Sequence, residues 1–357
     1  MAGMATVFKA SLTTFATSSE SLASARRNRM SMDMLYDDLN LAGMLPTSLV
    51  NWPAAVTSAN PPFMILPNQA YAGTDVPSAL AQADQLSFYY DEILPFQGTL
   101  QSDLPGATPG QPLPTQSTLA FRNEDQAKQV EAGMVLLTRA GVGYPRPITG
   151  ATVSGSQASI TFGGIEDIAD PSKGGSGGKY TILANSEVLV ARPGRYVRYS
   201  VQGRATDPED PARMVPCLIR EEVAYGRPFA AGEPGYTIAT VAENVRGLKV
   251  YLSADGGQNW AGLGSNPASW DDIVTELNDQ LATTGRPGYQ SVLSGSFWFR
   301  EIPVAVRLDV TTRTIRPRLE YSANPAAGTP DYREQTQSLV LIPRHFGLPY
   351  GRPLTTS

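Results

Sequence analysis

Residue types that support cross-linking and catalysis are scarce in this sequence. Its 357 residues include one cysteine, Cys217, and one histidine, His345. One cysteine excludes an intramolecular disulfide, and together with one histidine it excludes the usual zinc sites. Cys217 lies in an apolar run, so we expect a buried small hydrophobic residue. The sequence also lacks an apolar run of about eighteen residues, the length that crosses a bilayer.

Strong charge of one sign is absent as well. The net charge is −5, and no long run of lysine and arginine occurs. This excludes the basic footprint of a nucleic-acid-binding protein, so we expect no nucleic-acid partner. His345 would have to serve any histidine-activated nucleophile, but no Gly-x-Ser-x-Gly elbow accompanies it. We therefore expect a loop histidine, a chain that is not an enzyme, and no cofactor.

Two glycine-containing loops deserve comparison with ligand-binding motifs. The run Gly174–Lys179 fails as a phosphate loop because Lys173 and Tyr180 stand where a glycine and a serine or threonine are required. The run Asp255–Asn259 carries oxygen ligands but lacks the repeated aspartate and closing glutamate of a calcium loop. A plain turn is favoured for it, and calcium binding stays open.

The remaining carboxylate groups predict no paired acid and base. Asp207, Glu209 and Asp210 lie in a proline-broken loop, where charged residues are usually solvated. Glu221 and Glu222 are neighbours in an expected strand, so their side chains point to opposite faces. No metal site is expected from any of them.

A long helix is predicted at the N-terminus. No proline occurs from Met4 to about Gly43, and the composition favours a helix that ends at the glycine. About forty residues make a rod of roughly 60 Å, longer than one domain can cover. Apolar residues at helical spacing form a seam in its first half, which we predict to be an assembly interface: Met4, Phe8, Leu12, Phe15 and Leu22.

The second half of this helix has a wider apolar face, expected to dock on the rest of the chain. That face comprises Met30, Met34, Leu35 and Leu39. Charged residues cover the remainder of this half: Arg26, Arg27, Arg29, Asp33, Asp37 and Asp38.

After Gly43, proline-punctuated segments with period-two alternation predict many short strands. The expected strands are 85–90, 133–138, 148–153, 159–162, 179–183, 187–191, 196–202, 214–222, 248–253, 296–300, 304–310, 316–321 and 337–342. A second helix is expected over Trp270–Leu281, capped by Ser269. The loops 105–114 and 171–178 are rich in proline and glycine and are expected to be mobile. The predicted fold is α+β, a protruding helix (1–44) followed by a large antiparallel, two-sheet β-rich domain (45–357).

Several segments together resemble one family. Ala23–Leu45 is similar to the second half of the long helix in PilW-type minor pilins and J-type pseudopilins. Ala83–Phe88 resembles their first strand, and Val130–Leu137 resembles a PilW segment in which a glycine precedes a strand. Arg246–Trp260 and Ile302–Leu308 match in order a strand, a glycine-rich turn with tryptophan, and a closing strand. The similarity covers most of the chain thinly, and none of its motifs is catalytic.

The resemblance implies a structural subunit of a type IV pilus. Such a minor pilin starts or caps the filament together with other minor pilins, and it packs its helix against theirs and that of the major pilin. The family's leader and its apolar first half-helix are not in this sequence, which opens with the apolar stretch Met1–Phe8. We expect that such a segment preceded residue 1 and was trimmed away. It would hold the subunit in the bacterial inner membrane, facing the periplasm, before assembly into a pilus at the cell surface.

Two alternatives remain open. The first is a J-type minor pseudopilin of a type II secretion system. The second is a secreted adhesive or carbohydrate-binding β protein, which requires clustered exposed aromatic residues. The aromatic runs Phe88–Tyr90 and Trp298–Phe299 both lie in expected strands. An enzyme is disfavoured because no nucleophile, metal or cofactor motif is present.

Overall fold

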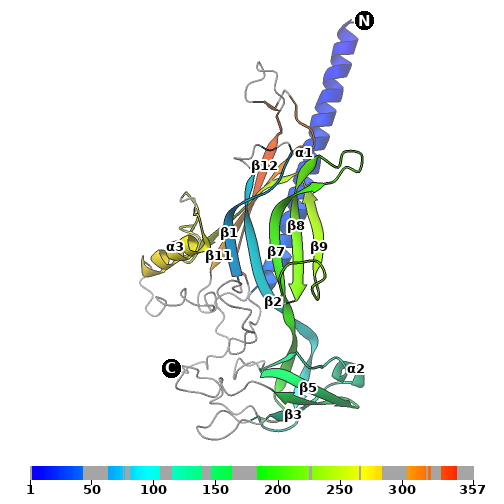
Figure 1. The fold of residues 1–357 in the computed structure, drawn as a ribbon, viewed down its shortest axis with the longest axis vertical. Coiled ribbons are helices and arrows are strands. Elements are labelled where there is room, and N and C mark those ends of the chain that lie inside the picture. Colours follow the sequence, from blue (N-terminus) through cyan, green and yellow to red (C-terminus); the bar gives the residue numbers. More distant parts are fainter. Residues whose placement is uncertain are drawn as a thin grey trace.

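A long N-terminal helix and two antiparallel sheets make up the fold (Figure 1). The computed structural model describes residues 2–42, 63–74, 76, 81–104, 115–138, 146–162, 183–224, 227–264, 267–283, 304–318, 321–322 and 331–343. Helix α1 spans Ala2–Leu41, in agreement with the predicted rod. The α+β class, with an N-terminal helix and antiparallel sheets, is therefore confirmed. The division at residues 44 and 45 stays a prediction.

Within the described residues, the large sheet has nine strands in the order β1-β2-β3-β6-β5-β4-β7-β8-β9. Strands β2 and β7 also pair directly with each other, which joins β2, β3, β6, β5, β4 and β7 into a ring. The strands are β1 (Phe63–Ala70), β2 (Gln82–Leu100), β3 (Gln116–Ala120), β4 (Val135–Thr138), β5 (Arg146–Ser154), β6 (Gln157–Phe162), β7 (Glu187–Ala205), β8 (Met214–Ala224) and β9 (Thr237–Glu243).

The small sheet has the order β10-β11-β12 in the described part of the chain. Its strands are β10 (Val245–Ser253), β11 (Ala305–Arg313) and β12 (Glu334–Leu341). Asp84, buried on β2, connects the two sheets. Its carboxylate accepts hydrogen bonds from the Val250 main-chain N–H (2.9 Å) and the Lys249 ammonium group (3.0 Å) of β10.

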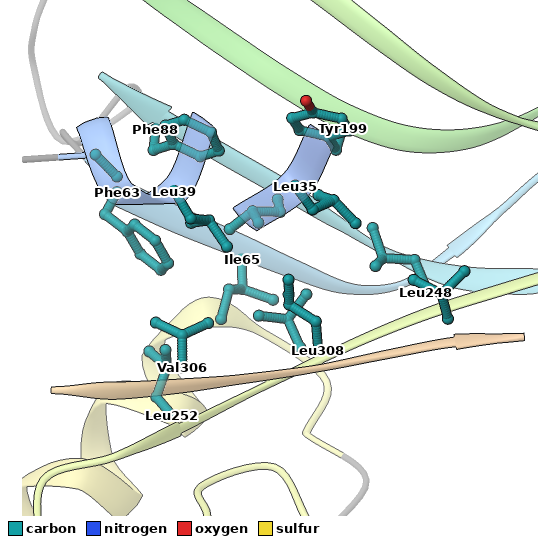
Figure 2. Close-up of a cluster of buried hydrophobic side chains, with 14 of the residues drawn as sticks. Leu35, Leu39, Phe63, Ile65, Phe88, Tyr199, Leu248, Leu252, Val306 and Leu308 are labelled. Carbon is teal, nitrogen blue, oxygen red and sulfur yellow. The ribbon is translucent and has the colours of Figure 1, made fainter. Parts of the chain in front are cut away.

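The main hydrophobic core lies between the two sheets and the second half of α1. Leu35 and Leu39 of α1 are fully buried, and Figure 2 shows them between Phe88 and Tyr199 of the large sheet and residues that include Leu308 of the small sheet. Burial of a leucine side chain contributes about 1.5–3 kcal/mol of transfer free energy. Packing against both sheets therefore fixes this half of α1 to the β strands.

A second core fills the ring of strands at the opposite end of the molecule from the N-terminus (Figure 1). It includes Leu100, Leu119, Ile160 and Val188, all of them fully or almost fully buried. The short helix α2 (Glu124–Ala127) lies beside this core and buries Ala127. This second core is separate from the main core, and β2 and β7 contribute residues to both.

Helix α3 spans Trp270–Thr283 and confirms the second predicted helix. The Ser269 hydroxyl accepts a hydrogen bond from the Asp272 N–H, and the Asp272 carboxylate accepts one from the Ser269 N–H (3.0 Å). This reciprocal pair satisfies N–H groups at the helix start. Trp270, Ile273 and Leu277 are buried, and they attach α3 to the main core.

Most predicted strands in the described residues are present, with three kinds of difference. The segments 187–191 and 196–202 form one strand, β7, because Pro193 and Gly194 lie in a bulge opposite the single residue Asp91. Strands β1, β3 and β9 were not predicted. The described part of the segment 316–321 has only an isolated bridge, between Arg318 and Asp331. The predicted strands 296–300 and most of 179–183, the stop at Gly43 and both expected mobile loops lie outside the described residues.

Candidate assembly surface on helix α1

The middle of α1 is attached to the small sheet by polar contacts. The Ser24 and Thr312 hydroxyls are hydrogen-bonded at 2.6 Å. The Arg27 guanidinium donates to the Arg313 carbonyl at 3.0 Å, and the Asn28 amide donates to the Gln335 carbonyl at 3.2 Å. Each of these bonds satisfies one polar group that would otherwise be costly to bury, although Arg27 Nε and Asn28 Oδ1 are buried and make none of them.

One turn earlier, two further contacts connect the helix to the loops beside that sheet. The Glu20 carboxylate accepts from Arg318 at 2.9 Å, and both side chains are largely buried. The Ser21 hydroxyl accepts from Arg333 at 3.2 Å. The attachment of α1 therefore extends from Glu20 to its C-terminal end.

A charged contact attaches the end of α1 to the large sheet. The Asp38 carboxylate accepts from the Tyr199 hydroxyl and from the Arg220 guanidinium, each at 2.6 Å. Arg220 also pairs with Glu222 at 2.6 Å. Burial, together with the nearby Asp38 charge, raises the pKa of Tyr199 well above its usual value, so its hydroxyl remains a donor. The two charges and the phenol hold this turn of the helix in one orientation.

A cavity of about 370 Å³ lies where α1 meets the start of β12. Its walls are largely polar, and they come from the helix, from β12 and from the loops next to it. They consist of Ser21, Ser24, Ala25, Thr314, Arg333, Glu334 and Gln335. This composition offers neither an apolar ligand pocket nor a nucleophile with a base beside it.

The opposite face of α1 carries exposed apolar side chains. Phe15 and Leu22, two members of the predicted seam, are 74% and 72% exposed. Met4, Phe8 and Leu12 lie on the same helix, outside the residues whose side chains the structure describes. A helix turns about 100° per residue, so residues seven positions apart lie almost in line. Phe15 and Leu22 therefore form one exposed line.

The exposed line continues down the docked half of the helix. Arg26, Arg29, Asp33 and Asp37 are exposed and lie within about 40° of the direction of Phe15 around the helix. The Arg29 and Asp33 side chains approach each other at 3.9 Å with most of their surface in solvent. We call the exposed residues from Phe15 to Asp37 on this side the α1 stripe: Phe15, Ser18, Ser19, Leu22, Arg26, Arg29, Met30, Asp33, Tyr36 and Asp37.

Met30 corrects one sequence-based expectation. It was assigned to the docking face with Met34, Leu35 and Leu39, but it is 53% exposed and belongs to the α1 stripe. Five positions separate it from Leu35, which places the two side chains about 140° apart around the helix. Met32, which was not assigned, is buried instead. The charged residues were expected only to cover the remainder of this half of the helix, although the rotation of 100° per residue places Arg26, Arg29, Asp33 and Asp37 on the same side as Phe15.

The other carboxylates considered as candidate sites are bound by groups of the chain itself. Both oxygens of Asp255 accept hydrogen bonds from its own turn. Glu221 binds Arg198 and Glu222 binds Arg220, on opposite faces of β8, as predicted. No cluster of three potential metal ligands occurs among the described residues.

The remaining predicted features divide between loops, the core and the undescribed segments. Asp207, Glu209 and Asp210 are exposed in a turn, and Cys217 is fully buried. Burial raises the pKa of the Cys217 thiol to about 11, so it stays protonated. Phe88 and Tyr89 are buried, so they offer no surface for an adhesive site. His345, Trp298, Phe299 and the glycine run 174–178 lie outside the described residues.

Comparisons with known proteins identify no relative. Protein-family models, curated proteins and solved structures gave no match to this chain. Among the described helices, none combines the length and the hydropathy that a bilayer crossing requires.

Proposed function

We propose that this chain is an assembly subunit of a type IV pilus, a minor pilin that acts at the filament tip with other minor pilins. Its task is to bind neighbouring subunits through the α1 stripe and to present the β-rich domain outward. It needs no catalytic group or cofactor for this. The J-type pseudopilin of a type II secretion system performs the same kind of assembly, and its partners would differ.

The exposure of Phe15 and Leu22 is the observation that carries this proposal. Both lie on a helix whose N-terminal part extends beyond the β strands (Figure 1), while Leu35 and Leu39 of the same helix are fully buried. A phenylalanine and a leucine held in water on a rigid helix forgo about 1.5–3 kcal/mol each of burial free energy. A neighbouring helix would recover that free energy by covering them.

The test is a pull-down of this chain with each pilin-like protein encoded beside its gene. We expect at least one partner to be retained, and we expect Phe15→Ser with Leu22→Ser to lose most of that partner. The matched control is Leu183→Ser, since Leu183 is an exposed apolar residue (62%) outside α1. Retention of no partner by the unmodified chain, or equal retention by the double variant, would contradict the proposal. A retained partner that belongs to a pilus would support the minor-pilin version. A retained partner that belongs to a type II secretion system would support the pseudopilin version.

A further inference from the structure

The four edge strands of the two described sheets differ in what covers them. Edge strand β1 contains Pro67, and its register is irregular next to that proline. On β10 the Val250 N–H donates to the Asp84 carboxylate, and on β12 the Gln335 carbonyl accepts from Asn28 of α1. Proline, an irregular register and a covering side chain or helix all keep a sheet edge from pairing with another chain. Strand β9 is the remaining edge.

The first half of β9 lacks such protection. It forms an outer edge of the large sheet in Figure 1, and residues 237–240 are all exposed, with Ile238 at 44%. These residues pair with β8 in regular register, and the irregularity between the two strands comes only after Thr240. The segment Thr237–Ala242 contains no charged residue and no proline, and its threonines, isoleucine and valine favour strands. This half of β9 is therefore suited to pair with a further strand.

Strand alternation decides which main-chain groups of β9 point outward. The Ala224 N–H of β8 donates to the carbonyl of Pro234, which precedes β9. Neighbouring residues of a strand direct these groups to opposite sides, so the even-numbered residues of β8 face β9 and bond its odd-numbered residues in the regular part. Ile238 and Thr240 therefore direct their N–H and carbonyl groups outward. Within the described residues, no hydrogen bond engages these four groups.

We propose that the outer side of β9 binds β9 of a second copy of this chain, antiparallel, about a two-fold axis at Ala239. In this register Ile238 of each copy lies opposite Thr240 of the other, and all four outward groups of each chain are hydrogen-bonded. A second copy fits because it presents the same unpaired groups, so that one contact satisfies two edges.

Neighbouring registers leave some of these groups unpaired. An axis at Ile238 sets Thr240 against Tyr236, whose N–H already donates to the Glu233 carbonyl. An axis at Thr240 sets Ile238 against Ala242, in the part of β9 where the register with β8 is irregular. The axis at Ala239 is therefore the one that the main chain favours.

The side chains agree with this register. Ala239 lies at the axis, in the pair without hydrogen bonds where the two chains approach most closely, and its methyl group leaves room there. The pairs of Ile238 with Thr240 join β-branched residues, which stabilise antiparallel strands. Glu243, the charged residue of β9, meets Gly235 of the second copy, so no like charges are opposed along the strand.

The β9 pair is separate from the contacts proposed for α1. A two-fold contact closes with two copies and does not extend a filament. It also uses no residue of the α1 stripe. The inference therefore goes beyond the proposed function and does not rest on it.

Cysteine cross-linking of the full chain tests the position of the axis. The only native cysteine, Cys217, is fully buried, so Ala239→Cys adds the one accessible thiol. Facing Cα atoms in a pair without hydrogen bonds are about 4.5 Å apart, which a disulfide can bridge. We expect mild oxidation to give a disulfide-linked dimer of Ala239→Cys. The matched control is Thr237→Cys, also exposed but away from the axis, which should remain monomeric. No dimer from Ala239→Cys, or equal dimer from both variants, would overturn the inference.

Sedimentation equilibrium over a range of protein concentration tests the pairing itself. We expect the unmodified chain to form dimers, and Ile238→Lys to weaken dimerisation at least about tenfold, because lysine on an edge strand opposes pairing. Thr240→Pro should act likewise, since it removes an outward N–H that makes no bond within the chain. The matched control is Ile315→Lys, because Ile315 is 45% exposed and lies outside β9.

The unfolding midpoints of these variants in urea should equal that of the unmodified chain, which separates lost pairing from lost folding. A monomer at all concentrations, assemblies larger than the dimer, or equal weakening by Ile238→Lys and Ile315→Lys would contradict the β9 pair. The pull-down of partner pilins depends on Phe15 and Leu22 of α1. Its outcome is independent of these results, so the failure of one proposal is distinguishable from the failure of the other.

Discussion

At the scale of single residues, both carboxylate oxygens of Asp255 accept hydrogen bonds from residues of the same turn. One oxygen accepts from the Ser253 hydroxyl at 2.6 Å and from the Gln258 N–H at 3.0 Å. The other accepts from the Asn259 side-chain amide at 2.7 Å. Burial alone would raise the pKa of Asp255, but these hydrogen bonds outweigh it and lower the pKa to about 2. The turn therefore favours the ionised carboxylate.

A pH-dependent stability difference follows from this lowered pKa. The ionised form stabilises the fold above the ordinary aspartate pKa of about 4, and this contribution is lost as the pH falls through about 2. We expect Asp255→Asn to lower the free energy of unfolding at neutral pH, and the difference from the unmodified chain to shrink between pH 4 and pH 2. Urea unfolding at several pH values measures it.

The control for this prediction is Gln258→Ala. It removes an exposed side chain and keeps the main-chain N–H that binds Asp255. Its stability should follow that of the unmodified chain at every pH. A difference between Asp255→Asn and the unmodified chain that persists undiminished at pH 2 would show that the carboxylate charge is not what stabilises the turn.

At the scale of elements, α1 is one continuous helix with two different surroundings. Its C-terminal half is covered by both sheets and buries Met32, Leu35 and Leu39. On the opposite side the α1 stripe faces water over its whole described length. Apolar residues of similar size on the same helix should therefore differ sharply in what they contribute to stability.

Leucine-to-alanine substitutions on the two sides test this difference. Leu35→Ala should lower the free energy of unfolding by about 2–5 kcal/mol, since it leaves a cavity in the main core. Leu22→Ala should change stability little, because Leu22 is largely exposed already. Its effect should appear in partner binding. Denaturant titration of both variants decides the matter, and a large loss of stability in Leu22→Ala would mean that the chain itself covers that residue.

The elements that could be predicted are those whose pattern was long or strongly periodic. Helix α1 lacks proline, and α3 has a serine cap followed by acidic residues, so both were predicted. Strand β1 was not predicted. It contains Pro67, which an edge strand can hold, and its register is irregular around that proline. Strand β9 was not predicted either, and exposed and buried residues do not alternate along it.

The candidate surface was predictable only in part. Phe15 and Leu22 followed from helical spacing and from the argument that a rod of this length must project. Met30 was misassigned because a methionine near Leu35 and Leu39 was taken as part of their face. Ser24 and Asn28 are buried against the small sheet, and no apolar pattern could show which partners they would find there.

At the scale of the whole molecule, the exposed end of α1 and the second hydrophobic core lie at opposite ends (Figure 1). The main core between them joins α1 to both sheets. This arrangement leaves the ring of strands around the second core away from the projecting part of α1. A neighbour bound along that part would leave this distal region accessible.

Cysteine labelling at position 22 tests most directly whether neighbouring molecules cover the α1 stripe. The only native cysteine, Cys217, is fully buried, so Leu22→Cys adds the reactive thiol to be followed by maleimide labelling. We predict rapid labelling of the purified chain and strong protection in the assembled state in cells, with Leu183→Cys labelled in both. Equal labelling of Leu22→Cys in the purified and the assembled states would contradict the account.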